Sequence, residues 1–199
     1  MTDRVWLVRH GATAWTGRRW CGTTDLPLSL SGRAQVRRLA ARLAGRVPDD
    51  AMVISSPARR AVETAQALVV PGRSVAIVEE LREVEFGAAE GLTWRQIERM
   101  LPALGAAVAS GATLVDWPNG EQGPALKRRV GAVLERIRRA PRPLVVVTHG
   151  GVARAFLDEL STITGPLGAT SALDHSFAPA SALELVRTPA GWVVEHGDD

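Results

Sequence analysis

The chain has 199 residues, of which 46% are hydrophobic, and a formal net charge of +3. This length fits one domain with room for at most an insertion. Its only cysteine, Cys21, excludes an intramolecular disulfide and a cysteine-rich zinc site. No stretch approaches the roughly 20 apolar residues of a membrane span, and Arg4 interrupts any signal-peptide pattern. We therefore expect a soluble, cytoplasmic protein that does not contact a membrane.

The positive charges are almost all arginine, since Lys127 is the only lysine. They gather around Arg37, Arg128 and Arg138, on the polar faces of segments with a helical pattern. A nucleic-acid surface would need a more concentrated basic footprint. We expect no nucleic-acid partner, and the sequence does not indicate an oligomeric state.

Short apolar segments alternate with amphipathic ones along the chain. The expected strands are Arg4–Val8, Met52–Ile54, Val75–Val78 and Leu144–Val147, then a hairpin of Ala182–Val186 and Trp192–Glu195. The expected helices are Ser31–Leu43, Ser55 to about Val69, Thr93–Met100, Pro102–Val108, Glu121–Arg139 and Gly151–Leu160, with residues 161–178 irregular. The alternation predicts an α/β fold, a three-layer sandwich with a mostly parallel central sheet flanked by helices.

Two long connections have no strong periodic pattern. Residues 9–30 form a Gly- and Thr-rich loop, and loops of this length are usually functional. Within it, Trp15 and Trp20 either line a substrate pocket or pack in the core, and Cys21 lacks a nearby histidine for thiol catalysis. We expect one domain over residues 1–199, in which residues 81–120 are a candidate lid or insertion.

Two of the expected strands end in a histidine followed by glycine. The first ends in Arg9-His10-Gly11 and the later one in Thr148-His149-Gly150. Ligands of parallel sheets bind beyond the carboxyl ends of the strands, so both imidazoles are expected at one site. The other histidines, His175 and His196, lack this context and are expected in surface or loop positions.

Two imidazoles beside arginines suit the transfer of a phosphoryl group, which needs positioning and charge compensation. A neutral imidazole is a good nucleophile toward an anionic phosphate, and His10 is the predicted nucleophile. Arg9 is predicted to clamp the phosphate oxygens with its forked donors. His149 is predicted to stabilise charge on the transferring group, with Thr16 as a further hydroxyl contact. The turn at Gly150 offers backbone N–H groups at a helix N-terminus.

An ordered series of motifs resembles the histidine phosphatase superfamily, the phosphoglycerate mutase-like proteins. The motifs are Leu7–Thr13, Gly32–Gln35, Ser55–Ala65, Leu81–Glu83 with Phe86–Gly87 and Glu90–Gly91, and Thr148–Gly151. Because the set spans most of the chain in the right order, it is more specific than one Arg-His-Gly tripeptide. The resemblance implies a phosphohistidine on His10, with no cofactor and no metal. It extends to the α-ribazole phosphatase and broad-specificity branches without choosing between them.

The resemblance also chooses between neighbouring residues of one type. Arg59 and Arg60 point about 100° apart on a helix, and the family pattern, two residues before Val62, implies Arg60 as the second phosphate clamp. It implies Glu83 as the general acid that protonates the leaving oxygen and then activates water. The carboxylates that compete with Glu83 for this role are Glu79, Glu80, Glu85 and Glu90. Glu63 and Glu90 are expected to orient other groups.

Some positions depart from the family pattern. Ala12 and Ala14 stand where acidic residues are frequent, Thr16 where Asn is common, and Ala89 where Trp is frequent. These departures spare the predicted catalytic set but leave the substrate open. The expected function is a metal-independent phosphomonoesterase for small phosphorylated metabolites. The alternatives are a cofactor-dependent phosphoglycerate mutase, although such mutases look longer, and a catalytically silent module that binds phosphorylated ligands.

Overall fold

A computed structural model describes residues 3–164, 177–189 and 191–197, and it contains a six-stranded sheet of order β3-β2-β4-β1-β5-β6. The strands are β1 (Arg4–Arg9), β2 (Met52–Ser55), β3 (Val75–Ile77), β4 (Leu144–Thr148), β5 (Ala182–Thr188) and β6 (Gly191–Gly197). Strands β1 to β4 pair in parallel, whereas β5 and β6 are antiparallel additions at one edge. The predicted mostly parallel sheet is confirmed.

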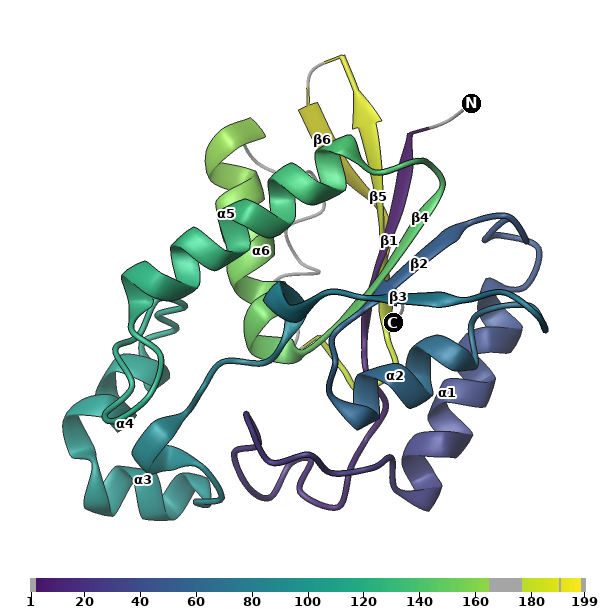
Figure 1. Cartoon of the computed structure of the whole chain (residues 1–199). Helices are drawn as coiled ribbons and strands as arrows, with labels where there is room; N and C mark the ends of the chain where they lie inside the picture. The colour runs from purple at the N-terminus through teal and green to yellow at the C-terminus, as the bar shows by residue number, and fades with distance from the viewer. Residues whose placement is uncertain (1–2, 165–176, 190, 198–199) are drawn as a thin grey trace.

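Helices cover both faces of this sheet, which confirms the predicted α/β layers. They are α1 (Leu30–Leu43), α2 (Arg59–Gln66), α3 (Trp94–Met100), α4 (Pro102–Ala109), α5 (Gly123–Arg139) and α6 (Gly150–Thr164). Helices α1 and α2 lie on one side of the sheet, and α5 and α6 lie on the other (Figure 1). Among the helices in the described residues, none is long and apolar enough to cross a membrane.

The apolar residues 5–8 of β1 contribute to two hydrophobic cores, one on each face of the sheet. Val5 and Leu7 belong to the core under α5 and α6, whereas Trp6 and Val8 belong to the core under α1 and α2. None of the four side chains is more than 1% exposed. Successive side chains of a strand point to opposite faces, so a strand covered on both faces must be apolar throughout.

Three helices differ by two residues or more from the sequence-based expectation. Helix α5 begins at Gly123, two residues after the expected Glu121. Helix α2 begins only at Arg59, after Ala58, whose backbone is not helical. It ends at Gln66 in tighter turns instead of reaching Val69. Helix α6 continues four residues past Leu160 to Thr164, so the expectation of irregular structure from residue 161 is wrong for these residues. The rest of that segment, with His175, lies mostly outside the described residues.

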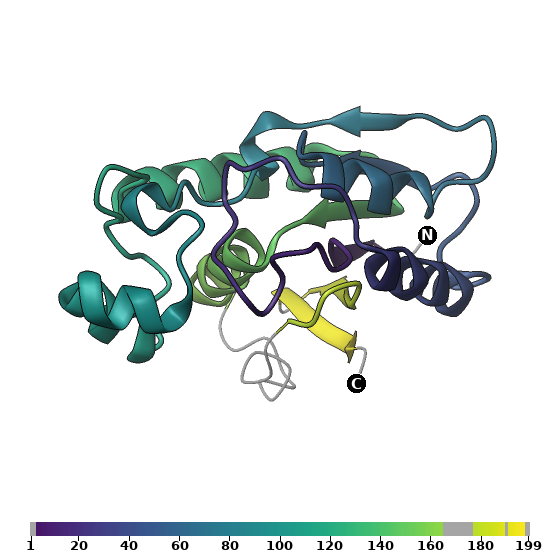
Figure 2. The ribbon, with the colours of Figure 1, turned by 90° about the horizontal axis from the view of Figure 1, so that it is seen from below.

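Residues 81–120 project from the sheet (Figure 1). They carry α3, α4 and the short 3₁₀ turn Gly87–Ala89, and another 3₁₀ turn, Glu79–Leu81, comes before it. Helix α3 starts at a capping box in which Thr93 and Gln96 exchange hydrogen bonds, as the predicted boundary requires. The N-terminal loop of residues 10–29 runs between this projection and α1 (Figure 2). Both segments therefore flank the carboxyl ends of β1 and β4.

Candidate active site

The two strand-end histidines lie side by side. Strands β1 and β4 are parallel neighbours in which Arg9 pairs with Thr148, so His10 and His149 follow at the same level. The amide of His10 donates to the carbonyl of Thr148 at 3.0 Å. The imidazole centroids of His10 and His149 are 5.0 Å apart, in an edge-on arrangement. The sheet register therefore brings the two imidazoles to one place.

The hydrogen bond of His10 defines its tautomer. Nδ1 lies 2.7 Å from the carbonyl oxygen of Gly11, which can only accept, so Nδ1 carries the proton. The lone pair of the neutral ring is then on Nε2. Burial, reinforced by the charge of Arg60 and then of Arg9, lowers the pKa of His10 from its usual 6.5 to about 3, although the Gly11 hydrogen bond opposes the shift. His10 is therefore neutral at physiological pH.

His149 has the opposite tautomer. Its Nδ1 accepts from Nε of Arg60 at 3.3 Å, and a guanidinium can only donate. The proton is therefore on Nε2, which donates to Oγ of Ser56 at 2.7 Å. Complete burial, followed by the nearby His10 and Arg60, lowers the pKa of His149 well below its usual value. Both rings are thus neutral and held in defined orientations.

Arg60 ties His149 to the long N-terminal loop. Its Nη1 donates to the carbonyl of Thr24 at 3.0 Å, and its Nη2 donates to that of Gly22 at 2.9 Å. A carboxylate of this loop, Asp25, in turn accepts from the first amide of α2, that of Arg59, at 2.7 Å. Arg60 is only 1% exposed, whereas the Arg59 side chain is 58% exposed. The buried arginine is thus the one beside the imidazoles.

Arg9 packs against the first turn of α6. A Cβ on Gly150 would lie only 3.2 Å from Cζ of Arg9, so glycine at this position leaves room for the guanidinium. Burial lowers the pKa of Arg9, while Glu83 acts in the opposite direction. Nη1 donates to the carbonyl of Phe177, but the buried Nε has no hydrogen-bond partner among the described residues. A buried N–H of this kind usually has a partner.

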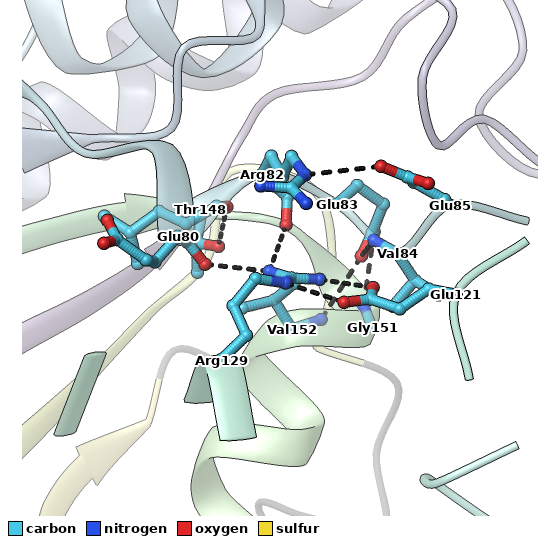
Figure 3. A network of polar contacts seen from close by, with 11 residues as sticks. Glu80, Arg82, Glu83, Val84, Glu85, Glu121, Arg129, Thr148, Gly151 and Val152 are labelled. Carbon is cyan, nitrogen blue, oxygen red and sulfur yellow. Dashed lines mark hydrogen bonds and ion pairs between the residues drawn. The ribbon is translucent and has the colours of Figure 1, made fainter. Parts of the chain in front are cut away.

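The carboxylate of Glu83 lies at the N-terminus of α6 (Figure 3). It accepts from the amides of Gly151 at 3.3 Å and Val152 at 3.2 Å. A Cβ on Gly151 would lie 2.7 Å from Oε1 of Glu83, so a side chain there would displace the carboxylate. The hydroxyl of Thr148 donates to the carbonyl of Leu81 at 2.9 Å and fastens the same segment. The helix N-terminus is therefore occupied by a carboxylate of the protein.

A cleft of about 630 Å³ joins most of the predicted site residues. Arg9, His10, Thr16, Glu83 and Gly150 line it, together with residues of the 81–120 projection. Arg60 and His149 are not among its lining residues in the described part of the chain; both are buried inside the protein. The imidazole of His10 therefore lines the cleft, whereas that of His149 is buried behind it.

The charges around this cleft are mostly positive. Four arginines line it, Arg9, Arg18, Arg19 and Arg154, against Glu83 as the single carboxylate among its described lining residues. Such a surface favours an anionic ligand. The described residues contain no group of three or more His, Cys, Asp or Glu side chains placed to hold a metal ion.

Ser56 was not singled out in the sequence, whereas Glu90 and Trp20 were named there as an orienting group and a pocket candidate. Ser56 directly follows β2, beside β4. Its position after an expected strand pointed to this region, but no sequence pattern indicated its bond with His149. Glu90 holds the N-terminal loop by accepting from the amides of Gly22 and Thr24. Trp20 lines the cleft, whereas Trp15 is not among the cleft's described lining residues and lies beside Gly91.

Comparison with known proteins decides the family. The model of the histidine phosphatase superfamily (branch 1) matches residues 5–199. The chain belongs to the histidine phosphatase superfamily. The family predicted from the motifs is thereby confirmed, and the predicted enzyme class, a phosphoric monoester hydrolase, agrees with it.

Relatives of this histidine phosphatase carry both phosphatase and mutase names. The acid phosphatase of Mycobacterium tuberculosis H37Rv is 34% identical over 77% of this chain and 73% of the relative. The glucosyl-3-phosphoglycerate phosphatase of Mycobacterium tuberculosis CDC 1551 is 31% identical over 92% of this chain and 91% of the relative. The crystal structure of phosphoglycerate mutase from Thermus thermophilus superposes with a TM-score of 0.71 at 34% identity, covering 98% and 99% of the two chains.

Proposed function

We propose that this histidine phosphatase hydrolyses phosphate monoesters of small metabolites through a phosphohistidine on His10. The observation that carries the proposal is the tautomer of His10, which leaves Nε2 with a free lone pair in a ring lining the cleft. A phosphate monoester repels anionic nucleophiles, whereas a neutral imidazole approaches without charge repulsion. The depressed pKa of His10 keeps this nitrogen unprotonated.

The substrate phosphate is held chiefly by Arg9. Arg9 lines the cleft, and the guanidinium donors that have no partner among the described residues are available to bind phosphate oxygens. Thr16 adds a hydroxyl at the cleft, and Gly150 leaves space for the guanidinium. Arg60 and His149 support His10 from inside the protein, and a direct contact of either with phosphate stays a prediction.

The reaction has two steps. Glu83 acts in its protonated form, after its carboxylate has taken a proton from solvent. Nε2 of His10 attacks phosphorus, the ester P–O bond breaks, and the leaving oxygen takes this proton from Glu83. The resulting carboxylate then takes a proton from water, whose oxygen attacks phosphorus and breaks the P–N bond. Inorganic phosphate leaves, and His10 and Glu83 return to their starting protonation states.

The test is release of phosphate from p-nitrophenyl phosphate in the presence of EDTA. We expect turnover with the chelator, loss of turnover in His10→Ala, and an acid-labile phosphoenzyme after quenching in alkaline denaturant. A His10→Ala variant with the wild-type rate would refute the nucleophile assignment. Loss of turnover on chelation would replace this mechanism with a metal-dependent one.

The similarity to the Thermus structure named phosphoglycerate mutase favours one alternative. It is tested with 3-phosphoglycerate, with and without 2,3-bisphosphoglycerate. Formation of 2-phosphoglycerate faster than release of inorganic phosphate would identify a mutase. Binding of phosphorylated ligands without any turnover would identify a silent binding module.

A further inference from the structure

Aromatic side chains gather in the cleft although the chain has few of them. The sequence contains six Trp, three Phe and no Tyr. Within the described residues, five of these nine line the cleft that contains His10: Trp20, Phe86, Trp94, Trp117 and Phe177. The core under α1 and α2, by contrast, contains one aromatic residue, Trp6, among mostly Val, Leu and Ala. Phe86 and Trp117 also belong to the core under α5 and α6, and Trp20 and Phe177 pack against it. Trp94 is therefore the ring of the five that core packing does not explain.

Four of these rings form one connected group, the aromatic wall, made of Trp20, Phe86, Trp94 and Trp117. The centroid of Trp20 lies 4.9 Å from that of Phe86 and 5.2 Å from that of Trp117. Trp94 lies 6.5 Å from Trp20. These separations are typical of favourable aromatic pairs. Since the rings come from the N-terminal loop and the 81–120 projection, the wall joins the two segments that flank the cleft.

The wall is held in place but is not fully covered. The amide of Trp20 donates to the carbonyl of Leu92, and the amide of Gly91 donates to the carbonyl of Trp20, both at 2.9 Å. Phe86 and Trp117 are each 5% exposed, whereas Trp94 is 37% exposed. A role limited to packing would bury the outer ring as well. The buried pair instead supports outer rings that present apolar surface to the cleft.

The cleft also has room and charge for more than a phosphate ion. Its volume of about 630 Å³ lies in the range of pockets that enclose drug-sized ligands. Val108, Val115 and Leu157 add apolar surface, while the positive charge of the lining arginines matches the phosphate. The combination fits a ligand with one anionic end and one large apolar end.

We propose that the alcohol part of the substrate is a flat aryl group or an apolar group of similar size that packs against Trp20 and Trp94. This inference rests on the proposed phosphatase function and specifies its substrate class. With the phosphate at His10, the aryl group would remove the exposed indole surface from water. A compact, charged alcohol such as a glycerate would make no use of this surface.

The test compares 2-(1-naphthyl)ethyl phosphate with ethyl phosphate, because both release a primary alcohol and differ mainly in apolar surface. We expect kcat/KM to be about 50-fold higher for the naphthyl compound, as removal of on the order of 100 Å² of apolar surface from water predicts. Trp94→Ala should lower this ratio by about ten-fold, and Trp94→Phe should restore most of it. The matched control is Trp192→Ala, whose indole packs near Arg142 outside the cleft and which should leave the ratio unchanged.

The outcomes separate this inference from the proposed function. Equal kcat/KM values for the two esters, or an unchanged ratio in Trp94→Ala, would overturn the aryl substrate class and leave the phosphatase intact. If neither ester is hydrolysed, the affinities of the two corresponding phosphonates, measured by calorimetry, still test the aryl site. Tighter binding of the naphthylethyl phosphonate would support the aryl site while contradicting the hydrolysis, and equal binding would overturn the aryl site.

Discussion

Arg129 on α5 holds both carboxylate oxygens of Glu121, at 2.8 Å from Nε and 2.5 Å from Nη2. Each side chain is 8% exposed. The remaining nitrogen, Nη1, donates to the carbonyls of Glu80 and Arg82 at 2.8 Å each (Figure 3). Because these carbonyls lie just before Glu83 in the chain, the ion pair anchors the segment that presents the predicted general acid.

Arg129 is therefore expected to act as a positioning residue. Arg129→Met should lower kcat about ten-fold or more through misplacement of Glu83, and should lower the free energy of unfolding by about 3–5 kcal/mol because Glu121 stays buried without its partner. The double variant Arg129→Met/Glu121→Leu should recover stability, since apolar pairs replace buried ion pairs well, but not kcat. Chemical denaturation and steady-state kinetics measure both. Recovery of kcat together with stability would refute the positioning role.

The neutral, buried His10 makes stability depend on pH. In the folded protein its pKa is about 3, against 6.5 for an exposed histidine. Between these values the unfolded chain binds a proton that the folded protein does not, so the free energy of unfolding falls as the pH falls below 6.5. His10 alone should account for about 2 kcal/mol of loss between pH 7 and pH 5.

The matched measurement is urea denaturation of the wild type and His10→Gln at pH 7 and pH 5. The variant should lose about 2 kcal/mol less than the wild type over this interval, although the buried His149 still contributes to both. Identical losses would contradict a neutral His10 in the folded state.

Glu83 is expected to matter most for poor leaving groups. Glu83→Gln should lower kcat/KM for an alkyl phosphate by about 10²–10⁴-fold, the usual contribution of a general acid. The loss for p-nitrophenyl phosphate should be much smaller, because its leaving phenolate needs no proton. Glu85→Gln is the control, since that carboxylate is 46% exposed and lies two residues away. Equal losses on both substrates would remove Glu83 from the proton-donor role.

The parts of the fold that follow from local pattern could be predicted from the sequence. The apolar run before His10 and the run before His149 each permit only a buried strand, and parallel strands end at the same edge of a sheet. The adjacency of the two histidines follows from these facts. The end of α2 could not be predicted from the local pattern, because Ala67 and Leu68, which follow Gln66, both have a high helix propensity.

The side-chain contacts that hold the imidazoles and Glu83 in place could not be predicted from the sequence for a different reason. Arg60 was assigned to phosphate from the family pattern, yet its donors reach Thr24, Gly22 and His149, which are 36 to 89 residues away. The bond between Arg129 and Glu121 likewise depends on how α5 packs against the loop before it. Side-chain partners of this kind are set by tertiary geometry, and periodicity carries no signal for them.

Ser56 provides the sharpest test of this support. Ser56→Ala removes the acceptor of the His149 Nε2 proton, which would then be buried without a partner, so the free energy of unfolding should fall by about 1–3 kcal/mol. Ser55→Ala is the matched control, because Ser55 is equally buried and its hydroxyl donates to the carbonyl of Ser56. Nitrogen-15 NMR of the imidazoles reads the tautomers directly. We expect the Nε2–H form of His149 in the wild type and in Ser55→Ala, and a loss of that single form in Ser56→Ala together with a lower kcat. An unchanged His149 spectrum in Ser56→Ala would show that Arg60 alone fixes the ring.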